Sequence, residues 1–254
     1  MPTKATLESS LARYSDALLA KQSSTARSAS LVDLDTWFRT ELRENTDARK
    51  NSSAANVFLT KSELVKLMQW KLARGKWRPR LESLVASNSE ASVETATRTP
   101  SFLVSPDADS DSIDIKTTMV TKMCELKGVG PATASAILAA LDPRSEPFMS
   151  DQALEFVHSR KDDPNEKAGK REYTMKAWRV FREQMRTRRD EEGWESMEDL
   201  EKALWSWGTE REFGLASEDN NKRRGAHGDA GEKERKKTRK AETLTGSATK
   251  KRKS

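Results

Sequence analysis

Cysteine and histidine are scarce in this sequence. Its 254 residues contain one cysteine, Cys124, and two histidines, His158 and His227. One thiol cannot form an intramolecular disulfide, and it cannot supply the ligands of a four-cysteine zinc site or iron–sulfur cluster. The two histidines have no other ligand residues beside them, so the sequence argues for no metal site. We therefore expect no cofactor, and we interpret Cys124 as a buried packing thiol.

Long hydrophobic runs are also missing. No stretch approaches the roughly 18 apolar residues that a membrane span requires, and no secretory signal opens the chain. Hydrophobic residues make up 35% of the sequence and charged residues 34%, which suits one soluble domain with polar extensions. We expect no membrane partner. The oligomeric state stays open, with a monomer as the simplest expectation.

Most of the chain lacks an excess of positive charge, although the net charge of the whole is +6. Residues 222–254 contain 13 Lys/Arg and 4 Asp/Glu, so subtracting their charge leaves about −3 for residues 1–221. Any nucleic-acid surface on the folded part must therefore be a local basic patch.

Apolar side chains nearly vanish near the C-terminal end, where three basic clusters lie. We expect residues 216–254 to form a disordered basic tail. The clusters fit nuclear import signals or nonspecific nucleic-acid contacts, and a solubilising role is the alternative. They span residues 222–224, 233–240 and 250–253. We therefore expect nuclear localisation.

The rest of the chain carries apolar residues at helical spacing, without a recurring alternation of the β kind. Thr60 and Glu63 form a capping box before one such helical stripe. Residues 45–56 are polar and predict a loop. We expect an all-α fold, with a partly flexible extension over 1–30, a helical domain over 31–215 and the tail.

The most informative stretch spans residues 126–138. Apolar residues at helical spacing end at Gly128 and Gly130, and glycine lets the chain reverse within a few residues. Pro131 suits the first turn of a second helix, because its missing N–H costs nothing there. The pattern predicts a helix-hairpin-helix unit over 115–141. The amides at the start of its second helix form a site for an anion.

We expect this hairpin to bind a DNA phosphate, and a turn used only for packing is the alternative. Contacts of this kind fix the position of DNA without reading its sequence. The expected phosphate-binding residues are Lys127, Gly128, Val129, Gly130, Ala132 and Thr133.

The stretch 126–138 resembles the hairpin of the helix-hairpin-helix DNA glycosylases. Asp151 follows Gly130 by 21 residues, close to the spacing at which those enzymes place their catalytic aspartate. Together with the run 70–80, the two features resemble more closely the Amun-like nuclear proteins, which are themselves glycosylase-like. The resemblance implies a glycosylase-like helical fold, DNA as the partner, and a hairpin able to hold a monovalent cation.

The resemblance also implies a role for Asp151. In those glycosylases the aspartate stabilises the cationic sugar or activates the attacking water. The alternative is that Ser150 and Asp151 only cap the following helix. Strand-cleaving relatives use a lysine where this chain has Ala132, which cannot form a Schiff base. An active enzyme would therefore be monofunctional, although Met149 and Ser150 also depart from the family pattern.

The run 70–80 interleaves tryptophan with basic residues. Cations can hold phosphates while aromatic rings stack on bases, and a glycosylase extrudes its target base into an aromatic pocket. The alternative is that the tryptophans belong to the core and the cations to a solvated rim. The candidates for DNA or base contacts are Trp70, Arg74, Lys76, Trp77, Arg78, Arg80 and Phe148.

Three functions follow from these patterns. We rank first a nuclear DNA-binding protein of this fold without enzymatic activity. The second is a monofunctional DNA glycosylase that uses Asp151. The third is a nuclear protein-interaction module whose partner surface is formed by Trp194, Trp205 and Trp207, for which core packing is the alternative.

Overall fold

The structure is a computed structural model that describes residues 2–24, 30–52, 56–100, 103, 113–158 and 171–215. The expected basic tail over 216–254 lies outside the described residues, as do its import signals. Contacts divide the chain into a unit of residues 1–213 and a second unit of residues 214–254.

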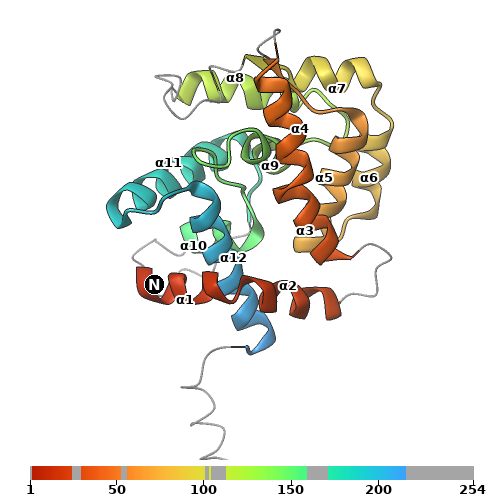
Figure 1. Cartoon of the computed structure of the whole chain (residues 1–254). Helices are drawn as coiled ribbons and strands as arrows, with labels where there is room; N and C mark the ends of the chain where they lie inside the picture. The colour runs from red at the N-terminus through yellow and green to blue at the C-terminus, as the bar shows by residue number, and fades with distance from the viewer. Residues whose placement is uncertain are drawn as a thin grey trace, which may run out of the picture. The chain divides into compact units, whose positions relative to one another are not determined.

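Helices dominate the described residues, which confirms the expected all-α class (Figure 1). Two short strands, β1 (Asn56–Val57) and β2 (Thr99–Pro100), pair in antiparallel fashion, which the sequence did not indicate. No helix of the described residues is long and apolar enough to cross a bilayer. The helices are α1 (Lys4–Ala12), α2 (Tyr14–Ser23), α3 (Leu31–Arg39), α4 (Glu41–Lys50), α5 (Lys61–Arg74), α6 (Pro79–Ala86), α7 (Glu90–Thr97), α8 (Ile113–Met123), α9 (Pro131–Leu141), α10 (Asp151–His158), α11 (Met175–Glu192) and α12 (Met197–Phe213).

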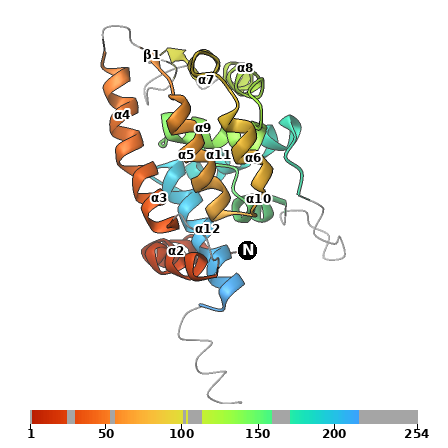
Figure 2. The same cartoon turned by 90° about the vertical axis from the view of Figure 1, so that its right-hand side faces the viewer.

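The N-terminal segment is part of the folded unit rather than an extension from it. Helices α1 and α2 pack against α12 (Figure 1), and the turned view shows α2 beside α12 (Figure 2). Leu7 and Ala17 are fully buried. Arg13 Nε lies 2.7 Å from Glu210 Oε1 and ties this segment to α12. Long-range packing, which local patterns do not reveal, explains the difference from the expected extension over 1–30.

Part of the polar stretch expected to be a loop is helical. Helix α4 continues to Lys50, and the side chain of Arg49 binds Glu63 with N–O distances of 2.9 Å. Charge pairing can hold a helix that has little apolar surface of its own. Glu63 also completes the predicted capping box, because its carboxylate accepts the amide of Thr60 at 2.8 Å. The loop predicted over 45–56 was therefore wrong as far as Lys50.

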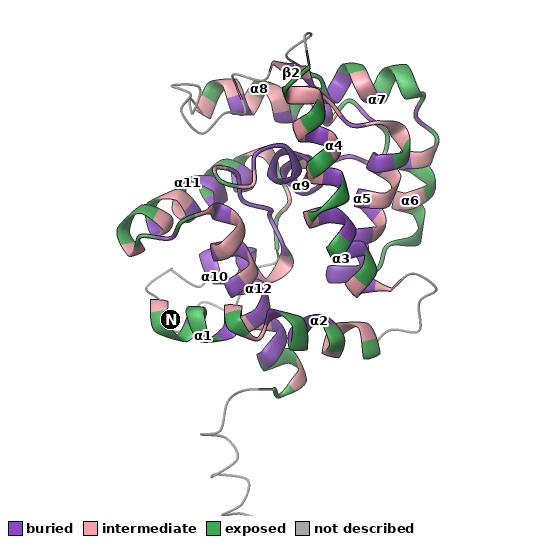
Figure 3. Cartoon of the chain, in the orientation of Figure 1, coloured by how far each residue is buried: buried purple, intermediate pink, exposed green. Residues whose placement is uncertain are grey.

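Helix α9 lies at the centre of the unit and packs against α4, α5, α8 and α11. Every residue from Ala132 to Leu141 is buried (Figure 3). The turn between α8 and α9 passes beside α6. Gly128 in this turn has a φ of 79°, and a Cβ there would lie 3.0 Å from Cβ of Leu84. Glycine is therefore required at this position both by conformation and by packing.

Cys124 lies just after α8 and packs against the core while remaining partly exposed. Burial raises the pKa of its thiol to about 11. The side chain therefore stays protonated at neutral pH and behaves as a packing group, although it is less buried than expected.

Candidate functional site

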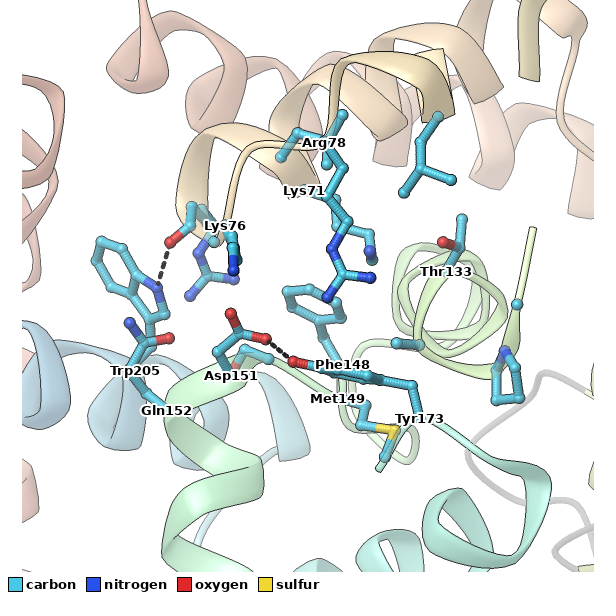
Figure 4. A pocket seen from close by; sticks show the side chains of 18 of the residues that line it. Lys71, Lys76, Arg78, Thr133, Phe148, Met149, Asp151, Gln152, Tyr173 and Trp205 are labelled. Carbon is cyan, nitrogen blue, oxygen red and sulfur yellow. Dashed lines mark hydrogen bonds between the residues drawn. The ribbon is translucent and has the colours of Figure 1, made fainter. Parts of the chain in front are cut away.

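A pocket of about 170 Å³ opens where three segments of the first unit meet. One wall comes from the end of α5 and the connection to α6, another from the turn before α9, and a third from residues 148–152. Figure 4 shows Lys71, Lys76 and Arg78 on one side of the pocket, with Asp151 and Tyr173 on the opposite side. The pocket thus collects basic side chains around one carboxylate.

The turn contributes backbone amides to this pocket. The amide of Lys127 donates to Oδ1 of Asn88 at 3.0 Å, and that of Val129 donates to the carbonyl of Leu126 at 3.1 Å. Within the described ranges, the amides of Gly130 and Ala132 have no acceptor. Both residues line the pocket, at the N-terminal end of α9. Two unused N–H groups at a helix N-terminus make a favourable position for an anion.

Asp151 begins α10, and its side chain is 18% exposed in the pocket. The Tyr173 hydroxyl donates to its Oδ1 at 2.6 Å, and Arg171 lies 3.4 Å from its Oδ2. Ser150, not Asp151, supplies the side-chain cap of α10, since its hydroxyl accepts the amide of Ala153 at 3.4 Å. The carboxylate of Asp151 is therefore turned toward the pocket and does not cap the helix.

Met149, the residue before Ser150, is held by the central helix α9. The amide of Met149 donates to the hydroxyl of Ser135 on α9 at 3.0 Å, so the loop that precedes α10 is fixed to the central helix. Phe148 and Met149 are both buried at the pocket wall. The position of Asp151 is thereby set by the core rather than by a loose surface loop.

Two titratable groups beside Asp151 have altered acidity. Burial, followed by the hydrogen bond to Asp151, raises the pKa of Tyr173 to about 12, so its phenol remains a hydrogen-bond donor at neutral pH. Burial lowers the pKa of Lys71 to about 8, although the charge of Asp151 opposes this change. Arg78 lowers that pKa further. The pocket therefore holds an amine that loses its proton at a lower pH than an ordinary lysine does.

The structure brings most of the sequence-predicted site residues to this pocket. The arrangement combines the turn, the basic run and the residues that precede α10, although these segments lie far apart in the chain. The predicted residues that line the pocket are Arg74, Lys76, Arg78, Gly128, Gly130, Ala132, Thr133, Phe148 and Asp151.

Trp70 lies in the core and cannot stack on a base. Its ring stacks on Phe38 with centroids 3.7 Å apart and planes inclined by 4°. Its indole N–H donates to Oδ1 of Asp35 at 2.8 Å. Arg74 is 1% exposed and held by Glu201 at 3.1 Å, so it supports the pocket wall rather than reaching for DNA.

Other candidates lie outside the pocket lining. Trp77 is 45% exposed, and Arg80 and Lys127 are also exposed. The side chain of Val129 is buried, which leaves only its backbone at the turn surface. Trp77 and Arg80 lie near Arg78 in the chain, and Lys127 lies at the turn before α9.

Sequence reasoning did not find Tyr173, Gln152 or Trp205 as pocket residues. Tyr173 lies just before α11, which begins at Met175. Trp205 donates from its indole to the carbonyl of Arg74 at 3.4 Å. No local pattern in the sequence signals these contacts, because they join segments more than 20 residues apart.

In the part of the chain that the structure describes, no group of three or more His, Cys, Asp or Glu side chains could hold a metal ion. Comparisons of the chain with protein-family models, with curated proteins and with solved structures found no match. The geometry of the pocket is therefore the basis for assigning a function.

Proposed function

We propose that this chain is a nuclear protein that binds duplex DNA through the helix-hairpin-helix segment over 115–141. In the pocket it would hydrolyse the bond between a base and its sugar. The observation that supports this proposal best is the position of Asp151. Its carboxylate shares one small pocket with the unused amides of Gly130 and Ala132 and with Lys76 and Arg78. The fold would then be of the helix-hairpin-helix glycosylase-like kind.

The anchoring step is the binding of a phosphate at the turn. The amides of Gly130 and Ala132 would donate to phosphate oxygens, and the N-terminal end of α9 would favour the negative charge. A Cβ on Gly130 would meet no atom within 4 Å, so the turn is open at this point. The exposed side chains of Lys76 and Arg78 would hold neighbouring phosphates on the opposite wall.

The size of the pocket limits what can enter it. Its 170 Å³ is close to the volume of about 150 Å³ that accommodates one benzene molecule in a protein cavity. A single extruded base is therefore a suitable occupant, whereas a stacked base pair is too large. Phe148 and Trp205 would supply apolar contact at the wall.

The proposed chemistry uses Asp151 as the carboxylate beside the reacting sugar. As the bond between C1′ and the base nitrogen breaks, its electron pair leaves with the base and positive charge develops on the sugar. Asp151 would stabilise that charge, and Tyr173 would hold the carboxylate in position. A water molecule then attacks C1′ and its proton passes to the released base, which completes a hydrolysis without a covalent enzyme intermediate.

One observation favours a second candidate, a DNA-binding protein without enzymatic activity. Both carboxylate oxygens of Asp151 already have partners, Tyr173 on one and Arg171 on the other. A neutralised carboxylate would stabilise a cationic sugar less well. DNA would then be held at the same surface without loss of a base.

A protein-interaction module receives less support. Trp205 is fully buried and Trp194 is 9% exposed, while Trp207 is partly buried and packs against the core. These tryptophans therefore pack α12 and the segment before it, which leaves little of their surface for a partner.

The test uses the full chain with duplexes that carry uracil, alkylated, oxidised or mismatched bases, and measures binding and free-base release together. Asp151→Asn should reduce release by at least about 100-fold, because a charged group would no longer face the cationic sugar. Its DNA affinity should change little. Asp16→Asn on the exposed side of α2 is the matched control and should release base at the normal rate.

Three other outcomes would decide against this mechanism. Release that is unchanged in Asp151→Asn would exclude the assigned role. Binding without release from any duplex would favour the second candidate. Failure of the chain to bind DNA at all would overturn both and direct attention to protein partners.

A further inference from the structure

Lys71 lines the pocket, but the proposed hydrolysis gives it no role. It lies on the last turn of α5, where its carbonyl accepts the amide of Gly75 at 3.1 Å. A Cβ on Gly75 would lie 3.5 Å from Oδ2 of Asp151, so the end of α5 approaches the carboxylate closely. The side chain of Lys71 thus belongs to the wall that faces Asp151 (Figure 4).

The other cation buried at this wall, Arg74, has a charged partner. Arg74 binds Glu201 and lies 4.6 Å from the ring centroid of Trp205. Within the described residues, the amine of Lys71 makes no hydrogen bond and no ion pair, and only the longer-range charge of Asp151 acts on it favourably. An amine on a pocket wall without a fixed partner is available to a ligand.

The acidity of Lys71 agrees with this availability. Its pKa is about 8 because burial disfavours the charged ammonium. At pH 7, roughly a tenth of such amines are neutral, which is several hundred times the fraction for an unperturbed lysine. A neutral amine is the nucleophilic form, and a desolvated lysine is a known way to obtain it.

We propose that Lys71 is a nucleophile that attacks the aldehyde of an abasic deoxyribose in this pocket and so cleaves the DNA strand. This proposal rests on the DNA binding proposed above, since the unused amides at the turn would hold the phosphate beside the abasic sugar. Ala132 excludes a Schiff base only at position 132. Lys71 reaches the pocket from a different helix.

The reaction balances without a further reagent. The neutral Nζ of Lys71 adds to C1′ of the open-chain sugar, and loss of water with uptake of one proton from solvent gives a protonated imine. Hydrolysis of the imine at the end of the reaction returns that proton. A proton then passes from C2′ to the Asp151 carboxylate, a double bond forms between C2′ and C3′, and the C3′–O bond breaks. The phosphate leaves with that electron pair. Water hydrolyses the imine, which restores Lys71 and leaves an unsaturated aldehyde on the cut strand.

The test uses the full chain and a duplex with a preformed abasic site, so it does not depend on base release. Borohydride reduces the imine to a stable amine, and the adduct is measured on a denaturing gel. Lys71→Arg should lower both the adduct and strand cleavage by at least about tenfold, because arginine stays protonated. The matched control is Lys66→Arg on the same helix, where Lys66 stacks over the Trp37 ring at 4.7 Å and should not affect cleavage.

Mapping of the trapped peptide identifies the reacting amine even where a variant folds poorly. An adduct on Lys71 in the wild-type chain supports the proposal. An adduct on another lysine, or an undiminished adduct in Lys71→Arg, would overturn it. Binding of the abasic duplex without any adduct would also overturn it while leaving base release by Asp151 intact. Trapping at Lys71 without base release from any lesion would support Lys71 and remove the proposed hydrolysis.

Discussion

Two clusters of charged and aromatic side chains in this protein use the same residue types in opposite ways. The first, which we call the α3 cluster, consists of Tyr14, Asp35, Arg39 and Glu198. The second is the pocket around Asp151. In the α3 cluster, Asp35 is 3% exposed and accepts from Tyr14 and Trp70 at 2.8 Å and from Arg39 at 2.9 Å. Asp151 accepts one hydrogen bond from Tyr173 and has Arg171 3.4 Å from its other oxygen, and its side chain stays 18% exposed.

The difference shows that burial and the number of hydrogen-bond partners distinguish a structural carboxylate from a functional one. The lone pairs of Asp35 are occupied, so a ligand has nothing left to bind there. Asp151 keeps capacity for a ligand, and the amines and guanidinium groups across the pocket remain accessible. A carboxylate is therefore a functional candidate when its partners do not exhaust it.

The largest effect should come from removing the central cation of the α3 cluster. Arg39→Met leaves Asp35 and Glu198 without their shared partner in a buried setting, and we expect the free energy of unfolding to fall by about 3–5 kcal/mol. The matched variant Arg78→Met removes an exposed pocket guanidinium and should cost less than about 0.5 kcal/mol. Chemical denaturation measures both. Equal losses would abolish the distinction between the clusters.

Acid should unfold the protein through the α3 cluster. Burial alone would raise the pKa of Asp35, but Arg39 and Arg74 outweigh it and lower that pKa below 3.8. Burial also opposes Arg39 and Arg43 at Glu198, whose pKa nevertheless falls below 4.5. A lowered carboxyl pKa stabilises the fold above the unfolded value, and this contribution is lost as pH falls through the folded value.

We therefore expect the free energy of unfolding to decrease as pH falls below about 4.5, measured by denaturation at a series of pH values. Glu198→Gln should flatten this dependence because it removes one of the two linked groups. An unchanged or steeper dependence in Glu198→Gln would contradict the assignment to the α3 cluster.

Local sequence patterns predicted the elements better than they predicted the clusters. The capping box at Thr60, the glycine turn and Pro131 at the start of a helix depend on neighbours in the chain, and each lies where it was expected. Trp70 shows the limit, because its place in the core depends on Asp35 and Phe38 from another helix. The sequence made Trp70 and Trp77 equal candidates for contacts with DNA, whereas the structure buries Trp70 and exposes Trp77.

The candidate site divides in the same way. The turn was found from its glycines and Pro131, and Asp151 from the resemblance to the glycosylases. The structure brings both to one pocket. Tyr173 was missed because its hydrogen bond to Asp151 crosses the segment between α10 and α11. Lys71 was identified as one of several cations in a basic run. Only its position opposite the carboxylate distinguishes it from the others.

The turn itself offers a smaller test, since its two glycines have different surroundings. Gly130→Leu places a side chain in open space with an ordinary φ, so the fold should be unaffected while a phosphate is obstructed. We expect about tenfold weaker DNA binding, or about 1.4 kcal/mol, by fluorescence anisotropy. Gly128→Ala should instead lower stability, because of its positive φ and its close approach to α6. Unchanged DNA affinity in Gly130→Leu would exclude phosphate binding at the turn.

The smallest effect concerns a single pocket cation and is best measured as a salt dependence. Lys76 is exposed at the pocket, so its proposed contact is with one phosphate. Lys76→Gln should reduce the slope of log affinity against log salt by about 0.9, with only a few-fold loss of affinity at low salt. Lys66→Gln, on the other side of α5, should leave the slope unchanged. Basic residues elsewhere in the chain contribute equally to both variants, so the difference between the two slopes isolates the pocket. Identical slopes would mean that Lys76 does not bind a phosphate. The contrast between the pocket and the α3 cluster would then depend on Asp151 alone.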